Sequence, residues 1–511
     1  MEMITFLIYS EDSTTCGRIT RTGKGVRARR LPFEALPMTQ AEERTADSGQ
    51  AATLQHNHAS MGTMTVLGLA AMQIGPGIAL AGGYLILYAG NASWLAMLGA
   101  LLATAALGVG VTAFARRFVV SGGLISYVGS VLGPWPRAFA AAGYLVGLLV
   151  SMAAVATGVV IFTASFLLEM GFGWGSSAVG QAISAVVLTA CACALAYRGL
   201  DTSVRVSVVL TFAGIPFAVW VSVAAIANTD FSLVEQFNFS GADFRLAVVI
   251  PAITIAAANF VGFEGVTAMA SEARDPRRSI PRLIALMLGV CGLSYVAMIW
   301  IQVPVLSSNL EALESGESPT TILAHVGNVS FLAAPLDLLL AAATFAGLVA
   351  TINYGSRIIG TAAADGLLPK GLSRIHPVYR SPVTAIVFIG VIAGGLPVLL
   401  QLISSASPLE SSVYLYTFYV YFYLLPYVLA AIAAVVMLVR EGGFRIFQIV
   451  TVTGSGLAWG YFFWFGLSHS DEGVFGMLPW LSLILTMALF LIFAIVQWRS
   501  PSRISKLEEV L

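Results

Sequence analysis

Charged residues are scarce in this 511-residue chain, where Asp, Glu, Lys and Arg together make up only 10%. Hydrophobic residues make up 58%, and the mean hydropathy is +0.86. A soluble domain needs a polar exterior that this composition cannot supply. The formal net charge is +0, so there is no basic excess of the kind that binds nucleic acid. The composition therefore predicts a polytopic membrane protein.

Cysteine and histidine are also rare, with four and five copies. Cys191, Cys193 and Cys291 lie inside apolar runs, so no extracellular disulfide framework is expected. The sequence contains no Walker motif, no histidine-based metal constellation and no plausible nucleophile–base triad, and its central apolar segments have no histidine. These absences disfavour an ATP-driven pump and an intramembrane enzyme. No cofactor is expected.

Long apolar runs dominate what is present. About twelve segments after residue 60 approach the length of roughly 20 residues that a spanning helix needs. We therefore predict an all-α fold of about 12 transmembrane helices, with helices 1–10 in a core (61–439) and helices 11 and 12 in 440–499. The predicted helix cores are Met64–Leu87, Trp94–Ala115, Arg137–Leu168, Val179–Tyr197, Val204–Ala227, Leu246–Ala270, Leu283–Val305, Phe331–Tyr354, Val383–Ile403, Val413–Val439, Phe447–Leu467 and Met477–Trp498.

The two ends of the chain are polar. Residues 1–60 are rich in arginine and lack a signal-peptide order of segments, which indicates a disordered cytoplasmic tail. The stretch from Met38 resembles a short transporter leader, so we expect that translation of the native protein starts at Met38. Residues 500–511 are predicted to form a cytoplasmic C-terminal tail.

The basic residues predict the orientation. If the N-terminus is cytoplasmic, Arg245 is the only one of the 26 Lys and Arg residues on the outside. This asymmetry is a strong positive-inside signal and supports the helix count. We expect both termini in the cytoplasm and the chain in a plasma or bacterial inner membrane, in contact with lipid.

Two apolar segments are interrupted at their centres. The first segment contains Gln73, Ile74, Gly75, Pro76, Gly77 and Ile78, and the sixth contains Asn259, Phe260, Val261, Gly262, Phe263, Glu264 and Gly265. Breaks at corresponding positions of two five-helix halves indicate an inverted-repeat transporter with its substrate between the breaks.

The first break predicts an anion site. Pro76 suits the opening turn of a half-helix, because its φ is already helical and its missing N–H would have been unpaired. The amides of Gly77, Ile78 and Ala79 would then be free to bind a carboxylate, and Gly75 and Gly77 have no side chain to obstruct it. The alternative is that this run only kinks a packed helix.

The second break predicts a cation site beside an acid. Carbonyls of Asn259, Phe260 and Val261 would end the outer half-helix and offer partial negative charge to an ammonium group. A carboxylate in mid-membrane is costly, so Glu264 is a candidate gating or proton-linked acid. The alternative is that Glu264 is a fixed acceptor that bridges helices.

Three further patterns have both a functional and a structural interpretation. Tyr414, Phe418 and Tyr421 recur at i, i+4 and i+7 and could face the pocket, although aromatic residues in spans are commonly interfacial or packed. Gly143 and Gly147 form a GxxxG pair that predicts close helix packing. Thr344 and Thr351 could bind an ion, but such hydroxyls usually bond to their own backbone.

The motifs together resemble a known family. The stretch from Phe260 to Arg282, FVGFEGVTAMASEARDPRRSIPR, is similar to the sixth-helix signature of the amino acid–polyamine–organocation (APC) permeases. The IGPGI run resembles the first-helix Gly-x-Gly motif of the family. Ser356–Ile386 and Ser121–Trp135 resemble its segments after helix eight and before helix three. The resemblance covers nearly all of the chain after residue 60.

The resemblance implies a LeuT-like (APC) fold, a five-plus-five inverted repeat with discontinuous helices 1 and 6. It also implies a secondary active permease that moves amino acids by alternating access, by proton-coupled symport or exchange. In it, Gly75, Gly77 and Ile78 would contact the substrate carboxylate and Phe260 and Val261 its ammonium group. The predicted fifth helix lacks the lysine of some proton-coupled relatives.

Other transport functions stay open. A carboxylate-free amine such as ethanolamine or a polyamine would leave the first-helix amides without an anion. A passive facilitator or channel would need a continuous polar pore, whereas the apolar segments show only isolated polar residues.

Overall fold

The computed structural model describes residues 7–8, 17–18, 29–30, 59–199, 209–229, 235–239, 241–314, 317–403, 408–442, 445–469 and 473–499. The chain divides into two compact units, Met1–Ala52 and Thr53–Leu511. In the first unit the described residues form three antiparallel two-residue strands, β1 (Leu7–Ile8), β2 (Gly17–Arg18) and β3 (Arg29–Arg30), in the order β1-β2-β3. The predicted start at Met38, most of the predicted N-terminal tail and the predicted tail 500–511 lie outside the described residues.

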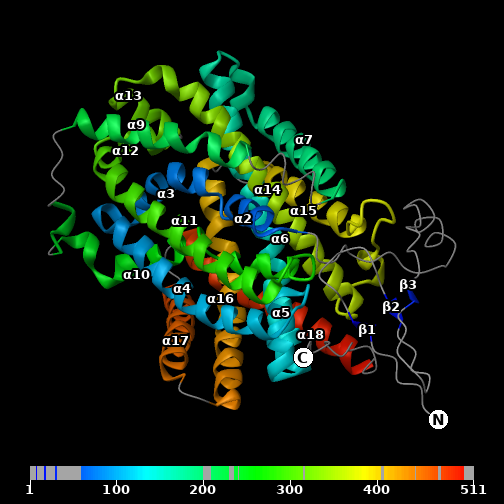
Figure 1. Ribbon diagram of the computed structural model, residues 1–511. Coiled ribbons are helices and arrows are strands. Elements are labelled where there is room, and N and C mark those ends of the chain that lie inside the picture. The colour runs from blue at the N-terminus through cyan, green and yellow to red at the C-terminus, as the bar shows by residue number, and fades with distance from the viewer. Residues whose placement is uncertain are drawn as a thin grey trace, which may run out of the picture. The chain divides into compact units, whose positions relative to one another are not determined.

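The second unit is helical (Figure 1). Its α-helices are α2 (Met61–Ala71), α3 (Ile74–Ala89), α4 (Ser93–Arg117), α5 (Gly123–Leu132), α6 (Pro134–Glu169), α7 (Ala178–Tyr197), α9 (Ile215–Ala227), α10 (Leu246–Ala257), α11 (Pro276–Ser307), α12 (Leu310–Glu314), α13 (Pro319–Val326), α14 (Ala333–Ala364), α15 (Val383–Ile403), α16 (Pro408–Glu441), α17 (Ile446–Ser468) and α18 (Gly473–Arg499). Short 3₁₀ helices are η1 (Gly90–Ala92), η2 (Gly173–Ser176), η3 (Glu235–Phe237), η4 (Ala242–Phe244), η5 (Phe263–Met269), η6 (Ser330–Leu332) and η7 (Lys370–Ser373).

The helices match the predicted membrane spans. In the described part of the chain, 10 helical segments are long and apolar enough to cross a membrane. The first, Met61–Arg117, includes α2, α3 and α4 and so contains the first two predicted spans. The sixth predicted span is divided between the short apolar α10 and η5. With those two differences, the helices follow the twelve predicted spans in order.

Small residues bring the central helices together. α6 packs against both α14 and α16. A Cβ on Gly143 would lie 2.8 Å from the carbonyl oxygen of Phe422, and one on Gly147 would lie 2.7 Å from the ring of Tyr423. These two glycines therefore let α6 approach α16 closely, as the GxxxG spacing predicts.

Two buried ion pairs fix α14 to its neighbours. Arg357 donates from Nε and Nη2 to the two carboxylate oxygens of Glu272, and both side chains are almost fully buried. Arg137 of α6 pairs with Asp365, directly after α14. Buried charges are stable only when they are paired and hydrogen-bonded. The Glu272–Arg357 ion pair thus holds the segment after η5 against α14.

Candidate functional site

The first interrupted helix is broken at Met72 and Gln73. α2 ends at Ala71, Gln73 takes a left-handed conformation with φ 52°, and α3 begins at Ile74. The break therefore precedes the Gly75-Pro76-Gly77 run, which forms the first turn of α3. This geometry is unusual, because a non-glycine residue in the left-handed region is strained.

The break lies earlier than predicted, and this changes which amides are free. The Gly77 amide donates to the Gln73 carbonyl at 2.8 Å, so the prediction of a free Gly77 amide is wrong. Ile78 and Ala79 lie deeper inside α3, where the helix uses its own amides. At the start of α3, only the amides of Ile74 and Gly75 precede the first helical hydrogen bond, because Pro76 has no N–H. The positive end of α3 is thus made by these two residues.

Gly77 is also needed for packing. A Cβ at this position would lie 2.5 Å from the ring of Tyr295 on α11. The Tyr295 hydroxyl donates to the Met72 carbonyl, at the end of α2. Tyr295 therefore holds both sides of the first break, and the absent side chain of Gly77 makes room for its ring. By contrast, a Cβ on Gly75 would make only ordinary contacts, at 3.6 Å or more.

The second interrupted helix is broken where the sequence predicted. α10 ends at Ala257, Gly262 has φ 96°, and η5 begins at Phe263. Only glycine adopts this conformation readily. The Phe260 carbonyl accepts from the Phe263 amide at 3.1 Å, whereas those of Asn259 and Val261 accept no backbone hydrogen bond among the described residues. Of the three predicted carbonyls, these two remain for a ligand.

Glu264 is fully buried behind the second break. Its Oε2 accepts from the Tyr427 hydroxyl at 2.6 Å, and the same hydroxyl accepts from the Gly262 amide at 2.9 Å. Its Oε1 makes no hydrogen bond of ordinary geometry among the described residues, and the buried Tyr144 hydroxyl is the second polar group that interacts with the acid. One α16 tyrosine therefore links the acid to the backbone of the break.

A cavity of about 60 Å³ lies between the two breaks. That volume holds a few water-sized groups. Its lining has no charged residue and consists of Ala71, Met72, Gln73, Pro76, Gly77, Leu80, Tyr84, Ser151, Val155, Ile255, Ala258, Asn259, Val261, Gly262, Met287, Thr351, Tyr354, Ser412, Val413, Tyr416 and Tyr419. Of the predicted site residues, the cavity brings together Pro76, Gly77, Asn259, Val261 and Gly262.

Five other predicted contacts do not line the cavity. Ile74, Gly75 and Ile78 are buried in α3, with only the amides of the first two at its free end. Phe260 packs its ring against the ring of Tyr295, with centroids 5.7 Å apart. The second break is therefore in contact with the tyrosine that holds the first. Glu264 is not among the lining residues, although Gly262, two residues before it, is one of them.

A different aromatic face of α16 borders the cavity. The structure places Tyr416 and Tyr419 there, and Tyr414, Phe418 and Tyr421 are not among the lining residues. Phe418 packs on Phe422 with centroids 4.7 Å apart, and Tyr421 faces Phe463 of α17 at 6.3 Å. The predicted spacing was helical, but it selected the wrong face, because α16 carries aromatic residues on several faces.

Three polar side chains that the sequence did not single out, those of Tyr84, Tyr419 and Gln302, help to hold the site. Asn259 donates to the Tyr84 hydroxyl at 2.6 Å, and the Tyr419 hydroxyl donates to the Ala258 carbonyl. Gln302 of α11 donates to the Ile78 carbonyl at 3.0 Å and to Ser222 at 2.9 Å. No local motif marks these residues; the only signal is that each is a polar side chain in an apolar helix.

The two candidate threonines follow their structural interpretation. The Thr344 hydroxyl donates to the Leu340 carbonyl at 2.7 Å, and the Thr351 hydroxyl donates to the Leu348 carbonyl at 2.9 Å. Both are therefore satisfied within α14, as is usual for hydroxyls in spanning helices. Thr351 still contributes to the cavity lining.

Two broken helices that meet at a central cavity define the class, a transporter with the LeuT-like fold. The crystal structure of MhsT in complex with L-phenylalanine is similar, with a TM-score of 0.52 and 15% identity over 86% of this chain and 99% of that one. At this identity the likeness shows the fold alone. The profile described as "Amino acid permease" matches residues 60–468. The chain therefore belongs to this family, within the APC superfamily.

Two curated relatives agree with the family. An uncharacterized transporter of Mycobacterium tuberculosis is 27% identical over 334 residues, which is 65% of this chain and 71% of that protein. The branched-chain amino acid permease BcaP of Bacillus subtilis is 23% identical over 353 residues, 66% of this chain and 74% of the relative. One is named a transporter and the other a permease, and the chain is a multi-pass membrane protein of the same family.

Proposed function

We propose that the protein is a secondary active permease for amino acids with neutral side chains. The observation that carries the proposal is the pair of backbone ends at one cavity. Gln73 and Pro76, which flank the free amides of α3, line it on one side, and Asn259 and Val261, with free carbonyls, line it on the other. Amides and carbonyls in this arrangement match the carboxylate and ammonium groups of an amino acid.

The lining favours a neutral side chain. Apolar and aromatic groups dominate it, and no Asp, Glu, Lys, Arg or His is present among the lining residues. A cationic side chain would lose its hydration there without an acid to pair with. BcaP is named for branched-chain amino acids, which agrees with this chemistry. The relatives also include plant cationic amino acid transporters, so the preference is a property to be measured for this chain.

Proton coupling through Glu264 forms the finer part of the proposal. Glu264 is fully buried beside the break and binds Tyr427 through Oε2, so Oε1 can take up a proton without disturbing that bond. The movement of η5 during alternating access would then change the surroundings of the acid. In the proposed orientation both termini face the cytoplasm, in a plasma or bacterial inner membrane.

The proposal is tested by uptake into proteoliposomes. Labelled valine, isobutylamine, lysine and ethanolamine would be compared with and without an inward proton gradient, and protein-free liposomes would serve as the control. We expect valine uptake that rises with the gradient. Uptake of isobutylamine, which is valine without its carboxylate, at the rate of valine would overturn the anion site. Uptake that is equal for all solutes and never exceeds equilibrium would indicate the alternative function, a passive facilitator.

A further inference from the structure

A second and much larger hollow shares no lining residue with the cavity between the two breaks. It has a volume of about 1320 Å³ and runs between α4, α11 and the start of α17. We call it the α4–α11 groove. Its lining residues are Leu101, Leu102, Ala105, Gly108, Val109, Thr112, Ala113, Arg116, Arg117, Arg277, Ile284, Ala285, Leu288, Gly289, Leu293, Glu441, Arg445, Phe447 and Gln448.

Small residues create the groove within two spanning helices. A Cβ on Gly289 would have no heavy atom within 4 Å, so this position opens directly into the groove. Leu102 and Leu293 on its rim are 61% and 66% exposed. Between Leu101 and Arg117, α4 rises by about 24 Å at 1.5 Å per residue. This exceeds the roughly 15 Å of half a hydrocarbon core, so the groove can receive an acyl chain along its full length.

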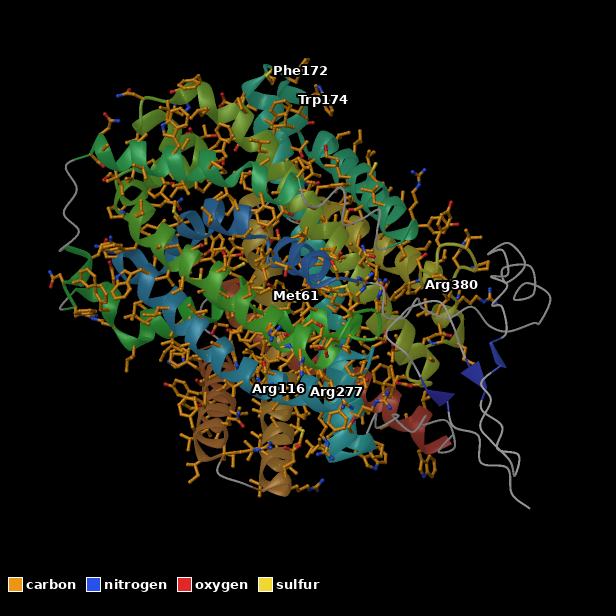
Figure 2. All side chains as sticks on the ribbon, in the orientation of Figure 1. Met61, Arg116, Phe172, Trp174, Arg277 and Arg380 are labelled. Atoms are coloured by element: carbon orange, nitrogen blue, oxygen red, sulfur yellow. The ribbon has the colours of Figure 1, made fainter. Side chains whose placement is uncertain are left out.

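Arginines gather at one end of the groove. Figure 2 labels Arg116 and Arg277, which line both the groove and an adjoining hollow of about 480 Å³. Arg278 and Arg282 line that second hollow. Arg117 pairs with Glu441 at 2.8 Å, and Arg445 pairs with the same carboxylate. Glu441 is the one acid among the residues that line the two hollows, so positive charge dominates this end.

We propose that the α4–α11 groove binds one anionic phospholipid, with its phosphate at Arg116, Arg277 and Arg282 and its acyl chains along α4 and α11. Guanidinium groups bind phosphate oxygens in bidentate geometry. Basic pockets between helices at the cytoplasmic side of a membrane recognise anionic head groups. A free phosphate would leave the apolar length unused. A second copy of the chain would bring arginine against arginine in a symmetric contact.

The first test uses the unmodified protein. The full-length chain would be delipidated in detergent and offered equal amounts of dioleoylphosphatidylglycerol and dioleoylphosphatidylcholine, and the retained lipids would be counted by native mass spectrometry. We expect one tightly held phosphatidylglycerol, which excess glycerol phosphate does not displace. Equal retention of both lipids would overturn the proposal, and so would complete displacement by glycerol phosphate.

Two variants test separately how much the arginine charge and the shape of the groove contribute to lipid binding. Near a membrane surface each arginine contributes about a fivefold gain in affinity for anionic lipid, so the triple variant Arg116→Gln/Arg277→Gln/Arg282→Gln should lose about a hundredfold. Its control replaces Arg198, Lys370 and Arg374, which are exposed elsewhere, by Gln. Gly289→Leu should block the chains while keeping all arginines, and Gly395→Leu is its matched control on α15, also with open space.

The outcomes are distinct. Loss of the bound phosphatidylglycerol in Gly289→Leu and in the arginine variant, with both controls unchanged, supports the proposal. Wild-type retention in both test variants overturns it. A dimer in the wild type that dissociates in Gly289→Leu would show that a second copy covers the groove. Should either variant fail to elute as a single species in size-exclusion chromatography, the lipid competition on the unmodified protein decides alone.

Discussion

The two interrupted helices meet at one cavity, but their backbones are broken and held by different means. The first break uses Gln73, a residue with a side chain in the left-handed region, and is held by the neutral Tyr295. The second uses Gly262 and is held by Tyr427 together with the buried Glu264. It is followed by the buried Glu272–Arg357 pair. The first break therefore stores backbone strain, whereas the second concentrates charge.

This difference suggests a division of roles. The first break presents amides and carries no ionisable side chain, so it suits a fixed anchor for the substrate carboxylate. The second break carries the ionisable Glu264 and is followed by the Glu272–Arg357 pair, so under the proposed function it is the break expected to respond to protons.

Glu272→Gln should have the largest effect. It leaves Arg357 buried without its charged partner, which typically costs about 3–5 kcal/mol. We expect a corresponding loss in the free energy of unfolding in detergent, measured by chemical denaturation. Asp275→Asn is the control, because the Asp275–Arg278 pair is exposed and its atoms are 3.7 Å apart. Equal loss in both variants would show that the buried pair does not anchor the second break.

Glu264→Gln should remove the response to the proton gradient. The amide keeps the shape of the acid and an acceptor for Tyr427, but it cannot exchange a proton. A gradient of one pH unit can drive about tenfold accumulation per proton, and this factor should fall to about one. The measurement is valine uptake as a function of external pH.

Asp337→Asn is the matched control for this variant. Asp337 is also a fully buried acid in a spanning helix, but both of its oxygens accept hydrogen bonds, from Ser165, Ser318, Thr320 and Thr321. We expect the gradient response to survive there. An unchanged pH profile in Glu264→Gln would make this acid a structural acceptor.

The helices could be predicted from hydropathy because lipid forces every backbone group into an internal bond. The second break was also visible in the sequence, since Gly262 is the residue that its conformation requires. The first break was placed too late. Local propensity favours glycine, and nothing near Gln73 shows that packing would impose the left-handed conformation there.

The surroundings of the site could be predicted least. Tyr427 lies 163 residues from Glu264 in the sequence, and no spacing rule connects them. On α16 the positions 414, 416, 418, 419 and 421 are all aromatic, so a helical period fits more than one face. Only tertiary packing decides that Tyr416 and Tyr419 face the cavity.

Gly262→Ala should have a moderate effect. The left-handed conformation costs an L-residue with a Cβ about 1–2 kcal/mol. Space does not limit the substitution, because the nearest atom to the new Cβ would be the Tyr354 hydroxyl at 3.7 Å. We expect stability to fall by this amount in denaturant titrations. Gly241→Ala is the control, since that residue has negative φ and a Cβ there would make only ordinary contacts, at 3.5 Å or more. A similar loss there would remove the conformational explanation.

Gln73→Gly should have the smallest effect and the opposite sign. Glycine relieves the left-handed strain of about 1–2 kcal/mol, but it also loses about 0.5–1 kcal/mol more conformational freedom on folding. The net result is a gain of roughly 0–1.5 kcal/mol in the free energy of unfolding, measured as for Gly262→Ala. A loss of more than about 1 kcal/mol would mean that the Gln73 side chain, packed against Gly347 of α14, holds the first break more strongly than its backbone strains it. The first break would then be an anchored element like the second, and the contrast between them would rest on charge alone.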